Sequence, residues 1–371
     1  MNVNKKPKVA CIFNYASHYN YPLYSLMDKE LPIDFYFGDV VKGNIKKFDV
    51  TLLAGFKKEL HTLFIGHLNY LAGGLGLIFK YDKFVITGEP YCISSWLILL
   101  ISRLTGKKVY LWTHGWYGRE SKIKRLLKYI YFSLGTKVLL YGNYARNLMI
   151  AEGFNPSKLN VIYNSLAYDD QLDVRQKLKP SEIYFNHFNN SNKVLFFIGR
   201  LIKDKKLSIL LDAVFELKKS GVNCNVVLIG EGEDTLYLKQ MADNLGICEQ
   251  VWFYGACYDE EEIGKLIFNA DLCVTPGAIG LTAIHSLTYG TPVVTHNDFK
   301  YHGPEFEAIQ DGITGGFFMK DDLNDLSKTI DVWIQKTTLN RESIREKCYE
   351  IIDEYYNPHF QVKLLNELLF V

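Results

Sequence analysis

Residues 271–294 constrain the fold of this chain most strongly, because they have the pattern of a strand, a turn, a helix and a second strand in immediate succession. The apolar run 271–275 predicts the first strand. A turn with Gly277 and Gly280 follows, then one short helix, and residues 290–292 lead into the second strand. Two strands joined by a crossover helix form a βαβ unit, so the stretch predicts a parallel α/β sheet.

The start of that helix is a candidate anion site. Its first backbone N–H groups, from Ile279 through Gly280 and Leu281 to Thr282, would have no partner within the helix. The helix dipole reinforces these donors, and such helix starts bind phosphate. The alternative is an ordinary βαβ unit in which the glycines only permit tight turns.

A second phosphate signal lies upstream, in residues 194–206. An apolar strand ends at Gly199, and Arg200 and Lys205 follow it in a loop. The carboxyl ends of parallel strands share one ligand-binding crevice, so both cations would face the turn at Gly280. A guanidinium fork and an ammonium together suit a diphosphate. The alternative is a solvated basic loop.

The rest of the chain also alternates strands with helices, which predicts parallel α/β sheets throughout. Its 371 residues suggest two domains, residues 1–168 and 193–357, joined by a polar linker at 169–192. An amphipathic helix is expected at 358–371. In the first half, strands are expected at residues 8–13, 33–37, 83–87, 107–113, 137–141 and 160–163, and helices at 21–30, 63–79 and 92–105.

Composition excludes several classes of protein. A hydrophobic content of 48% argues against disorder, and a net charge of +1 provides no overall attraction for nucleic acid. The seven cysteines lack C-x-x-C spacing, which indicates a reducing compartment. No signal peptide and no membrane-spanning run of about 20 apolar residues is expected. The first strand is not followed by G-x-G-x-x-G, so a dinucleotide oxidoreductase is disfavoured.

An ordered set of motifs resembles glycosyltransferase family four, retaining nucleotide-sugar enzymes of the GT-B fold. The resemblance is strong over residues 193–335 and weak over the N-terminal half. It implies two Rossmann-like parallel-sheet domains facing a cleft, the first for the acceptor and the second for the nucleotide sugar, with helix 358–371 packed back on the first. The motifs are residues 199–201 with Lys205, 227–232, 251–255, 270–276, 290–294 and 307–315.

The resemblance also implies roles for single residues. Arg200 and Lys205 match the diphosphate-binding pair, and the loop after residues 251–255 would lie over the nucleobase. The chain departs from the family where two glutamates normally contact the donor sugar and ribose, because Gly277 and His285 stand there. A neutral imidazole can still bond one ribose hydroxyl. Two nearby carboxylates could replace the missing ones, those of Glu305 and Glu307.

Three side chains of the first half are expected to open onto the cleft. His114 follows a strand and precedes Gly115, and relatives often have a histidine near the donor sugar at this place; the alternative is a loop histidine bonded to backbone. His18 follows the first strand, where the family often has glycines that are missing here. Glu89 is expected either to face the cleft or to cap the next helix.

Residues 119–137 combine basic and apolar side chains in the pattern of an amphipathic helix. Such a helix can lie on an anionic membrane. The alternative is a surface helix with its lysines in water. Lipid-linked acceptors are frequent in the family, which favours the membrane interpretation.

The predicted function is transfer of a hexose-like sugar, with retention, from a nucleoside diphosphate sugar to a glycan or lipid-linked acceptor in bacterial surface polysaccharide or lipopolysaccharide synthesis. No cofactor and no metal is expected beyond the donor substrate. The protein is expected in the cytoplasm, in contact with the inner membrane face. The alternatives are a catalytically weak nucleotide-sugar-binding subunit of the same fold and a nucleotide-sugar epimerase.

Overall fold

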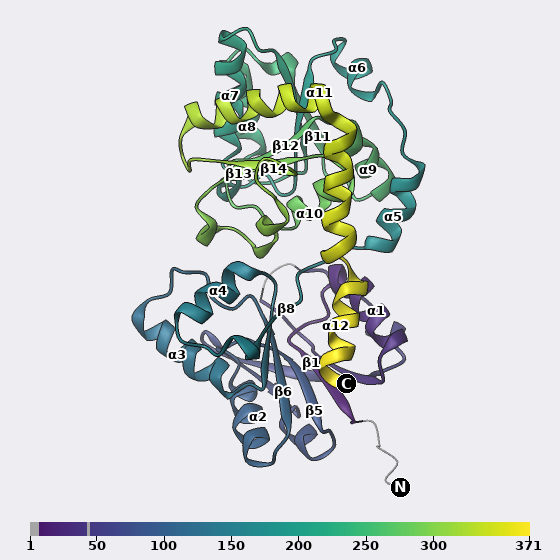
Figure 1. The fold of residues 1–371 in the computed structure, drawn as a ribbon, viewed down its shortest axis with the longest axis vertical. Helices are drawn as coiled ribbons and strands as arrows, with labels where there is room; N and C mark the ends of the chain where they lie inside the picture. Colours follow the sequence, from purple (N-terminus) through teal and green to yellow (C-terminus); the bar gives the residue numbers. More distant parts are fainter. Residues whose placement is uncertain (1–6, 43–44) are drawn as a thin grey trace. The chain divides into compact units, whose positions relative to one another are not determined.

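The structure is a computed structural model that describes residues 7–42 and 45–371. The first residues, on which the expectation of no signal peptide depends, lie outside this range. The chain divides into two compact units, Met1–Ala167 with Asn357–Val371 and Tyr168–Tyr356. Figure 1 shows that helices flank one sheet in each unit. The predicted fold class, two parallel-sheet α/β domains, is therefore confirmed.

Unit 1 contains a sheet of the order β4-β3-β2-β1-β5-β6-β7-β8, in which only β3 and β4 pair antiparallel. The strand order reverses between β1 and β5, which makes the carboxyl ends of these two strands a switch point. The strands are β1 (Val9–Phe13), β2 (Ile33–Gly38), β3 (Phe56–Ile65), β4 (Leu68–Ala72), β5 (Lys83–Thr87), β6 (Lys108–Thr113), β7 (Lys137–Leu140) and β8 (Leu159–Val161). The α-helices are α1 (Tyr21–Glu30), α2 (Ile93–Leu104), α3 (Lys122–Leu134), α4 (Asn143–Ala151) and α12 (Pro358–Phe370).

The helix expected at residues 63–79 is wrong. This stretch completes β3, turns at Gly66 into the antiparallel strand β4, and ends in a 3-10 turn, Leu75–Phe79. The backbone is left-handed at Gly66 (φ 60°), which breaks a helix and suits a tight hairpin. In β3, Leu60 and Thr62 are buried, whereas His61 and Leu63 are exposed. The apolar composition concealed this alternation.

The C-terminal helix α12 belongs to unit 1. Val362, Leu365 and Leu369 are buried in the same apolar cluster as one face of the central strands. The hydroxyl of Tyr110 donates to the carbonyl of Leu368 (2.8 Å), which ties the last turn of the helix to β6. The end of the chain thus completes the core formed by its beginning.

Unit 2 contains six parallel strands in the order β11-β10-β9-β12-β13-β14. The order reverses between β9 and β12, the second switch point. The strands are β9 (Lys193–Ile198), β10 (Cys224–Ile229), β11 (Val251–Gly255), β12 (Leu272–Thr275), β13 (Val293–His296) and β14 (Gly315–Phe318). The α-helices are α5 (Tyr168–Lys177), α6 (Ile183–Phe188), α7 (Leu207–Lys219), α8 (Thr235–Asn244), α9 (Glu260–Asn269), α10 (Leu281–Thr288) and α11 (Leu323–Tyr355).

Residues 169–192, expected to be a linker, instead contribute α5 and α6 to unit 2. The hydroxyl of Tyr184 in α6 donates to the carbonyl of Leu266 in α9 (2.6 Å). Gln171 and Val174 in α5 are buried. Few side chains of these short helices are buried, so their sequence lacks the apolar period that marks a helix.

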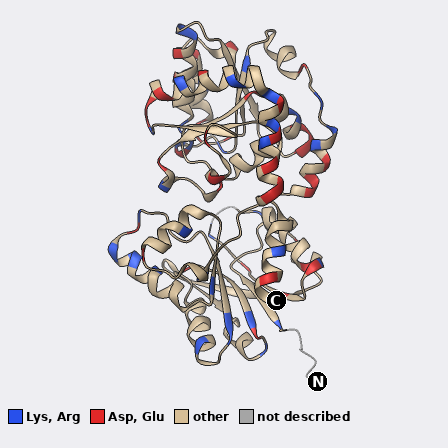
Figure 2. Ribbon diagram, viewed as in Figure 1, with Lys and Arg blue, Asp and Glu red and all other residues tan. Residues whose placement is uncertain are grey.

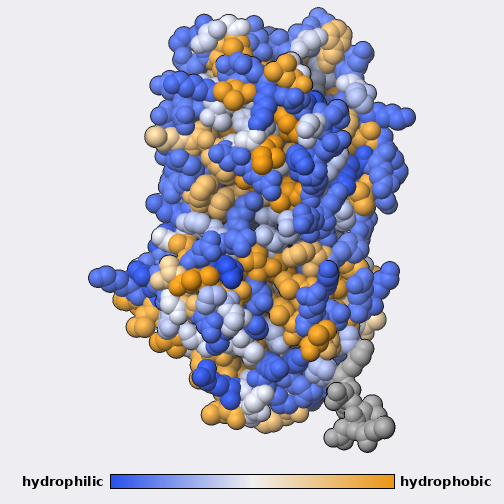
Figure 3. All heavy atoms as spheres, viewed as in Figure 1, coloured by the Kyte–Doolittle hydropathy of each residue, from blue (hydrophilic) through white to orange (hydrophobic). Residues whose placement is uncertain are grey.

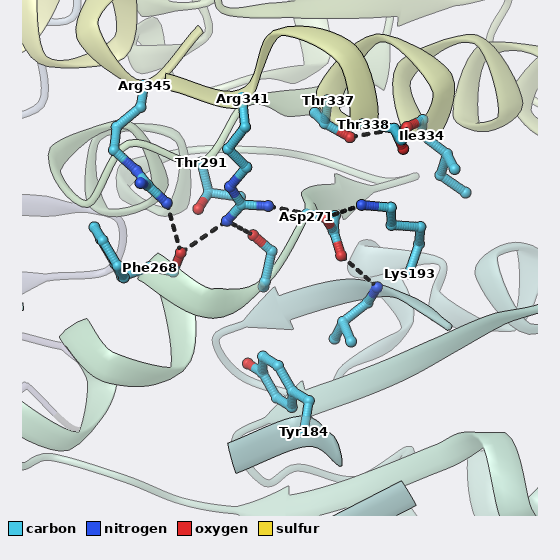
Figure 4. A network of polar contacts seen from close by, with 12 residues as sticks. Tyr184, Lys193, Phe268, Asp271, Thr291, Ile334, Thr337, Thr338, Arg341 and Arg345 are labelled. Atoms are coloured by element: carbon cyan, nitrogen blue, oxygen red, sulfur yellow. Dashed lines mark hydrogen bonds and ion pairs between the residues drawn. The ribbon is translucent and has the colours of Figure 1, made fainter. Parts of the chain in front are cut away.

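Helix α11 clamps the amino ends of the unit 2 strands. It departs from helical geometry at Asn340, and Figure 1 shows its two halves running in different directions. Just beyond this bend, Arg341 donates to the Asp271 carboxylate (2.8 Å) and to the carbonyl of Phe268 (2.7 Å). Asp271 also accepts from the backbone N–H of Val194 (2.8 Å). Figure 4 shows Arg341 and Lys193 beside the same carboxylate. The network joins α11, β9 and β12.

Candidate functional site

The switch point of unit 2 brings the two predicted phosphate loops together. Strands β9 and β12 are direct parallel neighbours, so the loops that follow them meet. The N–H of Gly277 donates to the carbonyl of Lys205 (3.0 Å), and that of Ala278 to the carbonyl of Asp204 (3.0 Å). Arg200, Lys205 and the start of α10 therefore lie around one point at the carboxyl ends of the strands.

Glycines fix the path of the loop that carries Arg200. A Cβ on Gly230 would lie 1.9 Å from the carbonyl oxygen of Gly199, and a Cβ on Gly232 would lie 2.2 Å from that of Leu201. The loop after β9 thus runs directly against the loop after β10. Gly199 itself has φ 143°, a conformation that other residues rarely adopt.

The two cations of this site differ in their surroundings. Arg200 is exposed, and within the described part of the chain its side chain makes no hydrogen bond or ion pair. Lys205 is half-buried and donates to the carbonyl of Ala278 (2.6 Å). Burial and the charge of Arg200 lower the pKa of Lys205. An anion bound here would relieve the repulsion between these two charges.

The start of α10 offers fewer free donors than the sequence predicted. The N–H of Ile279 is not free, because it donates to Nδ1 of His302 (3.1 Å). The hydroxyl of Thr282 donates to the carbonyl of Ile198 (2.9 Å), which ties the helix to β9. Among the described residues, no partner accepts from the backbone N–H groups of Gly280, Leu281 or Thr282.

A buried histidine pair supports this helix start. His302 donates through Nε2 to the carbonyl of His296 (2.8 Å), and the two rings stack with centroids 4.0 Å apart. Burial lowers the pKa of His302 to about 4, against the opposing effect of its bond to His296. The neutral ring keeps Nδ1 available as the acceptor for Ile279. No sequence motif signalled this support, because the contact joins two loops.

The backbone at Gly277, where the resemblance led us to expect a glutamate, has no room for a side chain. A Cβ on Gly277 would lie 2.0 Å from the carbonyl oxygen of Asp204, so the Lys205 loop leaves room for glycine only. A different carboxylate lies nearby. Glu305 is buried in the 3-10 turn Pro304–Ala308, and its Oε2 is 3.6 Å from where a Cβ on Gly280 would be. Glu307 is half-buried on the same turn.

His285 is part of a polar cluster that the sequence did not reveal. Its Nε2 lies 2.8 Å from Oε1 of Glu260 in the first turn of α9. The same oxygen accepts from the hydroxyl of Tyr289 (2.7 Å) and from the amide of Gln171 (2.9 Å). Glu260 follows β11 by a short loop, and an acidic residue after a strand end was the signal that could have identified it.

Unit 1 has a second polar site at its own switch point. The N–H of Asn14, after β1, donates to the hydroxyl of Thr87 at the end of β5 (3.1 Å), and the Asn14 amide bonds the Glu89 carboxylate. A cavity of about 220 Å³ is lined by Asn14, Asn69 and Glu89 among others. Burial raises the pKa of Glu89, although bonds from Asn69 and Asn14 oppose the change. Glu89 does not cap α2, whose N-cap residue is Cys92.

The two predicted histidines of unit 1 have different environments. His114, after β6, is exposed, and its ring lies against Tyr141 (centroids 4.8 Å) and Tyr117 (6.1 Å). Within the described chain its ring nitrogens make no hydrogen bond, so the alternative of a backbone-bonded loop histidine does not hold. The Nδ1 atom of His18 lies 3.2 Å from the carbonyl oxygen of Lys46, so one of its ring nitrogens contacts the backbone.

Residues 7–42 and 45–371 contain neither a cluster of metal ligands nor a membrane-spanning helix. No group of three or more His, Cys, Asp or Glu side chains is placed to hold a metal ion. No helix in the same range combines the length and apolar character needed to cross a membrane.

Comparisons with known proteins agree with the resemblance in the C-terminal half. Residues 180–350 match the sequence model of the family described as Glycosyl transferases group 1. Alpha-monoglucosyldiacylglycerol synthase of Streptococcus pneumoniae is 28% identical over 185 residues, 48% of this chain and 40% of that protein. A GDP-mannose-dependent alpha-(1-6)-phosphatidylinositol dimannoside mannosyltransferase of Mycobacterium tuberculosis is 34% identical over 104 residues, 27% of this chain and 26% of that one. The matches span less than half the length of these curated relatives.

Solved structures extend the likeness to both units. The Anabaena protein Alr3699/HepE, in complex with UDP, has a TM-score of 0.72 at 16% identity, covering 97% of this chain and 99% of that one. The apo lipopolysaccharide outer core galactosyltransferase WaaB has a TM-score of 0.69 at 15% identity over 97% and 99%. These neighbours share the GT-B fold, which is thereby the fold of this chain.

Proposed function

We propose that this protein is a glycosyltransferase that moves a hexose-like sugar from a nucleoside diphosphate sugar to a glycan or lipid-linked acceptor. The observation that carries this proposal is the switch point of unit 2, where the unpaired Arg200, Lys205 and the free N–H groups of Gly280 to Thr282 converge. Fixed donors around one point suit a diphosphate. The UDP complex of Anabaena HepE and the group 1 match of residues 180–350 support the same donor class.

The chemistry proposed for this site is departure of the diphosphate from the anomeric carbon. Negative charge grows on the leaving group, and preorganised donors stabilise it without reorganising. The Arg200 fork, the Lys205 ammonium and the helix start would supply these donors. Retention follows from the family resemblance. His285 would face the ribose, and Glu305 or Glu307 would replace the missing sugar-binding carboxylate.

The acceptor site is proposed for unit 1. The cavity at Asn14 and Glu89 offers an amide and a carboxylate, which suit sugar hydroxyls. His114 is exposed as a residue, its ring nitrogens make no hydrogen bond within the described chain, and we assign it to the transferred sugar. No cofactor beyond the donor is required by this scheme.

The decisive experiment is a thermal-shift screen of nucleoside diphosphates and their sugars, followed by transfer assays with the donor that binds. A bound ligand at a hundredfold excess over Kd stabilises a protein by about 2.7 kcal/mol. Transfer to an added acceptor supports the enzyme. Binding without transfer supports a binding subunit, and a new sugar nucleotide formed without acceptor supports an epimerase. Activity that EDTA abolishes and magnesium restores would contradict the metal-free scheme.

We also propose that α3 holds the protein on the inner face of the cytoplasmic membrane. Ile123, Leu126 and Ile130 lie on one face of this helix and are 83%, 62% and 46% exposed, and Leu104 at the end of α2 is 86% exposed. Figure 3 shows hydrophobic residues at the surface over α3, and Figure 2 shows basic residues on the same helix. Apolar side chains flanked by cations fit an anionic bilayer surface.

The ion pairs of α3 define the variants that test this contact. Lys128 pairs with Glu120 (2.7 Å) and Arg125 with Glu152 (2.7 Å), so the apolar side chains provide most of the expected attraction. Ile123→Gln with Leu126→Gln should abolish flotation with phosphatidylglycerol vesicles. Lys122→Gln with Lys124→Gln should weaken it only at low salt. If all variants float with the vesicles as well as the original protein does, α3 is an ordinary surface helix. The same conclusion follows if neither the original protein nor any variant floats.

A further inference from the structure

The Glu260 carboxylate is set at the ligand-binding edge of unit 2. It opens α9, which follows β11, so it lies at the carboxyl ends of the parallel strands. It contacts His285 of α10, three residues beyond Thr282. Three residues of helix rise about 4.5 Å. Along α10, Glu260 therefore comes about one turn after the proposed diphosphate site, as the ribose follows the diphosphate in a nucleotide.

The carboxylate is held so that one oxygen is used and the other is free. Oε1 accepts from His285 (2.8 Å), Tyr289 (2.7 Å) and Gln171 (2.9 Å). Among the described residues, none donates to Oε2. The side chain is 32% exposed, and that of His285 is 15% exposed. The three donors fix the orientation of the group and leave Oε2 as an acceptor at the surface.

The group is also permanently charged near neutral pH. Burial disfavours the ionised form, but the bonds from His285, Tyr289 and Gln171 outweigh burial and lower the pKa of Glu260 to about 2. A carboxylate accepts hydrogen bonds only, so its natural partners are hydroxyl or N–H donors. In doubly wound nucleotide-binding sheets, an acidic side chain commonly accepts from the ribose hydroxyls.

We infer that Glu260 is the residue that recognises the ribose hydroxyls of the donor nucleotide, with His285 as its positioning residue. The inference rests on the proposed function and names a residue that the sequence resemblance did not. Other acidic groups of the region suit this role less well. Glu262 accepts from the hydroxyl of Tyr254 (3.1 Å), and Glu305 lies at the Gly280 end of α10, beside the proposed phosphates.

The test compares a nucleotide with its deoxy forms. The nucleoside diphosphate that binds best among UDP, GDP and ADP is titrated by calorimetry, together with its 2′-deoxy and 3′-deoxy analogues. The original protein should prefer the ribonucleotide over at least one analogue tenfold or more, the effect of one hydrogen bond to a charged group. Glu260→Gln should lose most of that preference. Its affinity for the disfavoured deoxy analogue should stay nearly the same as that of the original protein. Glu261→Gln, an exposed neighbour in the same turn, is the matched control.

Several outcomes would overturn the inference. Glu260→Gln with an undiminished ribose preference would show a packing role, as would equal losses for the ribonucleotide and the analogues. If Glu260→Gln does not fold, Glu260→Asp keeps the charge and withdraws it by one methylene, and it should reduce the preference. If the original protein binds the ribonucleotide and both deoxy analogues with equal affinity, the inference about Glu260 is wrong but the proposed function stands. Failure to bind any of the three nucleotides defeats the proposed function as well.

Discussion

Two charged side chains at opposite ends of the unit 2 sheet, Asp271 and Arg200, have opposite environments. At the amino ends of the strands, the Asp271 carboxylate is bonded by Arg341, Lys193 and the N–H of Val194. Figure 4 shows the bonds from Arg341 and Lys193 converging on it. At the carboxyl ends, Arg200 has no partner among the described residues. Removing one partner of a charge that is satisfied within the protein destabilises the fold, whereas an unpaired cation on a fixed loop is available to a ligand. This difference favours the carboxyl ends of the strands as the proposed binding edge.

The largest change in stability is expected for a substitution at the amino ends of the unit 2 strands, called here the amino edge. Asp271→Ala leaves Arg341 and the N–H of Val194 without their acceptor, and breaking such a buried pair costs about 3–5 kcal/mol of unfolding free energy. Chemical denaturation measures this loss, and Asp243→Ala, an exposed acidic residue, is the control. Nucleotide affinity of the folded protein should not change. A large loss of affinity with little loss of stability would reverse the assignment of the two edges.

At the carboxyl ends of the strands, the carboxyl edge, we expect the converse: a loss of nucleotide affinity without a loss of stability. Arg200→Ala should lower nucleoside diphosphate affinity and kcat/KM at least tenfold, because a charge-assisted hydrogen bond contributes about 1.5–3 kcal/mol. The melting temperature without ligand should stay the same, since Arg200 has no partner in the described chain. Lys203→Ala, an exposed lysine of the same loop, should behave like the original protein. Unchanged kinetics of Arg200→Ala would refute the diphosphate assignment.

Gly277 tests whether backbone packing fixes the carboxyl edge. Gly277→Ala places a Cβ 2.0 Å from the carbonyl oxygen of Asp204 and must separate the two phosphate loops. Overpacking of this kind costs about 1–3 kcal/mol of stability. Both the melting temperature and nucleotide affinity should fall, and Gly277→Glu should lower activity rather than raise it. Gly76→Ala, with open space around it, is the steric control. A fully active Gly277→Glu would show that the loops move apart freely.

The last comparison concerns pH, and near neutral pH its effect on stability is the smallest of the four. The folded pKa of His302, about 4, lies below its ordinary value of 6.5, so the fold favours the neutral ring. The resulting stability is complete above pH 6.5 and is lost as pH falls toward 4, by about 1.4 kcal/mol per pH unit for one group. His302→Gln should show a shallower decline in denaturation series, whereas His67→Gln, an exposed histidine, should not. Equal slopes in all three proteins would remove His302 as the acid-sensitive support of α10.

The sequence by itself determined the class of the fold and the centre of the candidate anion site. Alternating strands and helices specify parallel sheets, and in such sheets the loops that follow the strands lie at one edge. The structure adds that β9 and β12 are direct neighbours. This local information was enough to predict that Arg200, Lys205 and Gly280 lie at one site. The fold class and this site follow from the periodicity of the apolar residues and from the order of the elements, and both can be read from a single sequence.

Tertiary structure alone decided everything that depends on contacts between distant segments. The hairpin at residues 63–79 is fixed by pairing of β3 with its sheet, and α5 and α6 are stabilised by α9 rather than by their own composition. Glu260 meets His285 only because α9 and α10 pack together. No local pattern encodes such pairings, because the partners are brought close only when burial of apolar surface folds the chain.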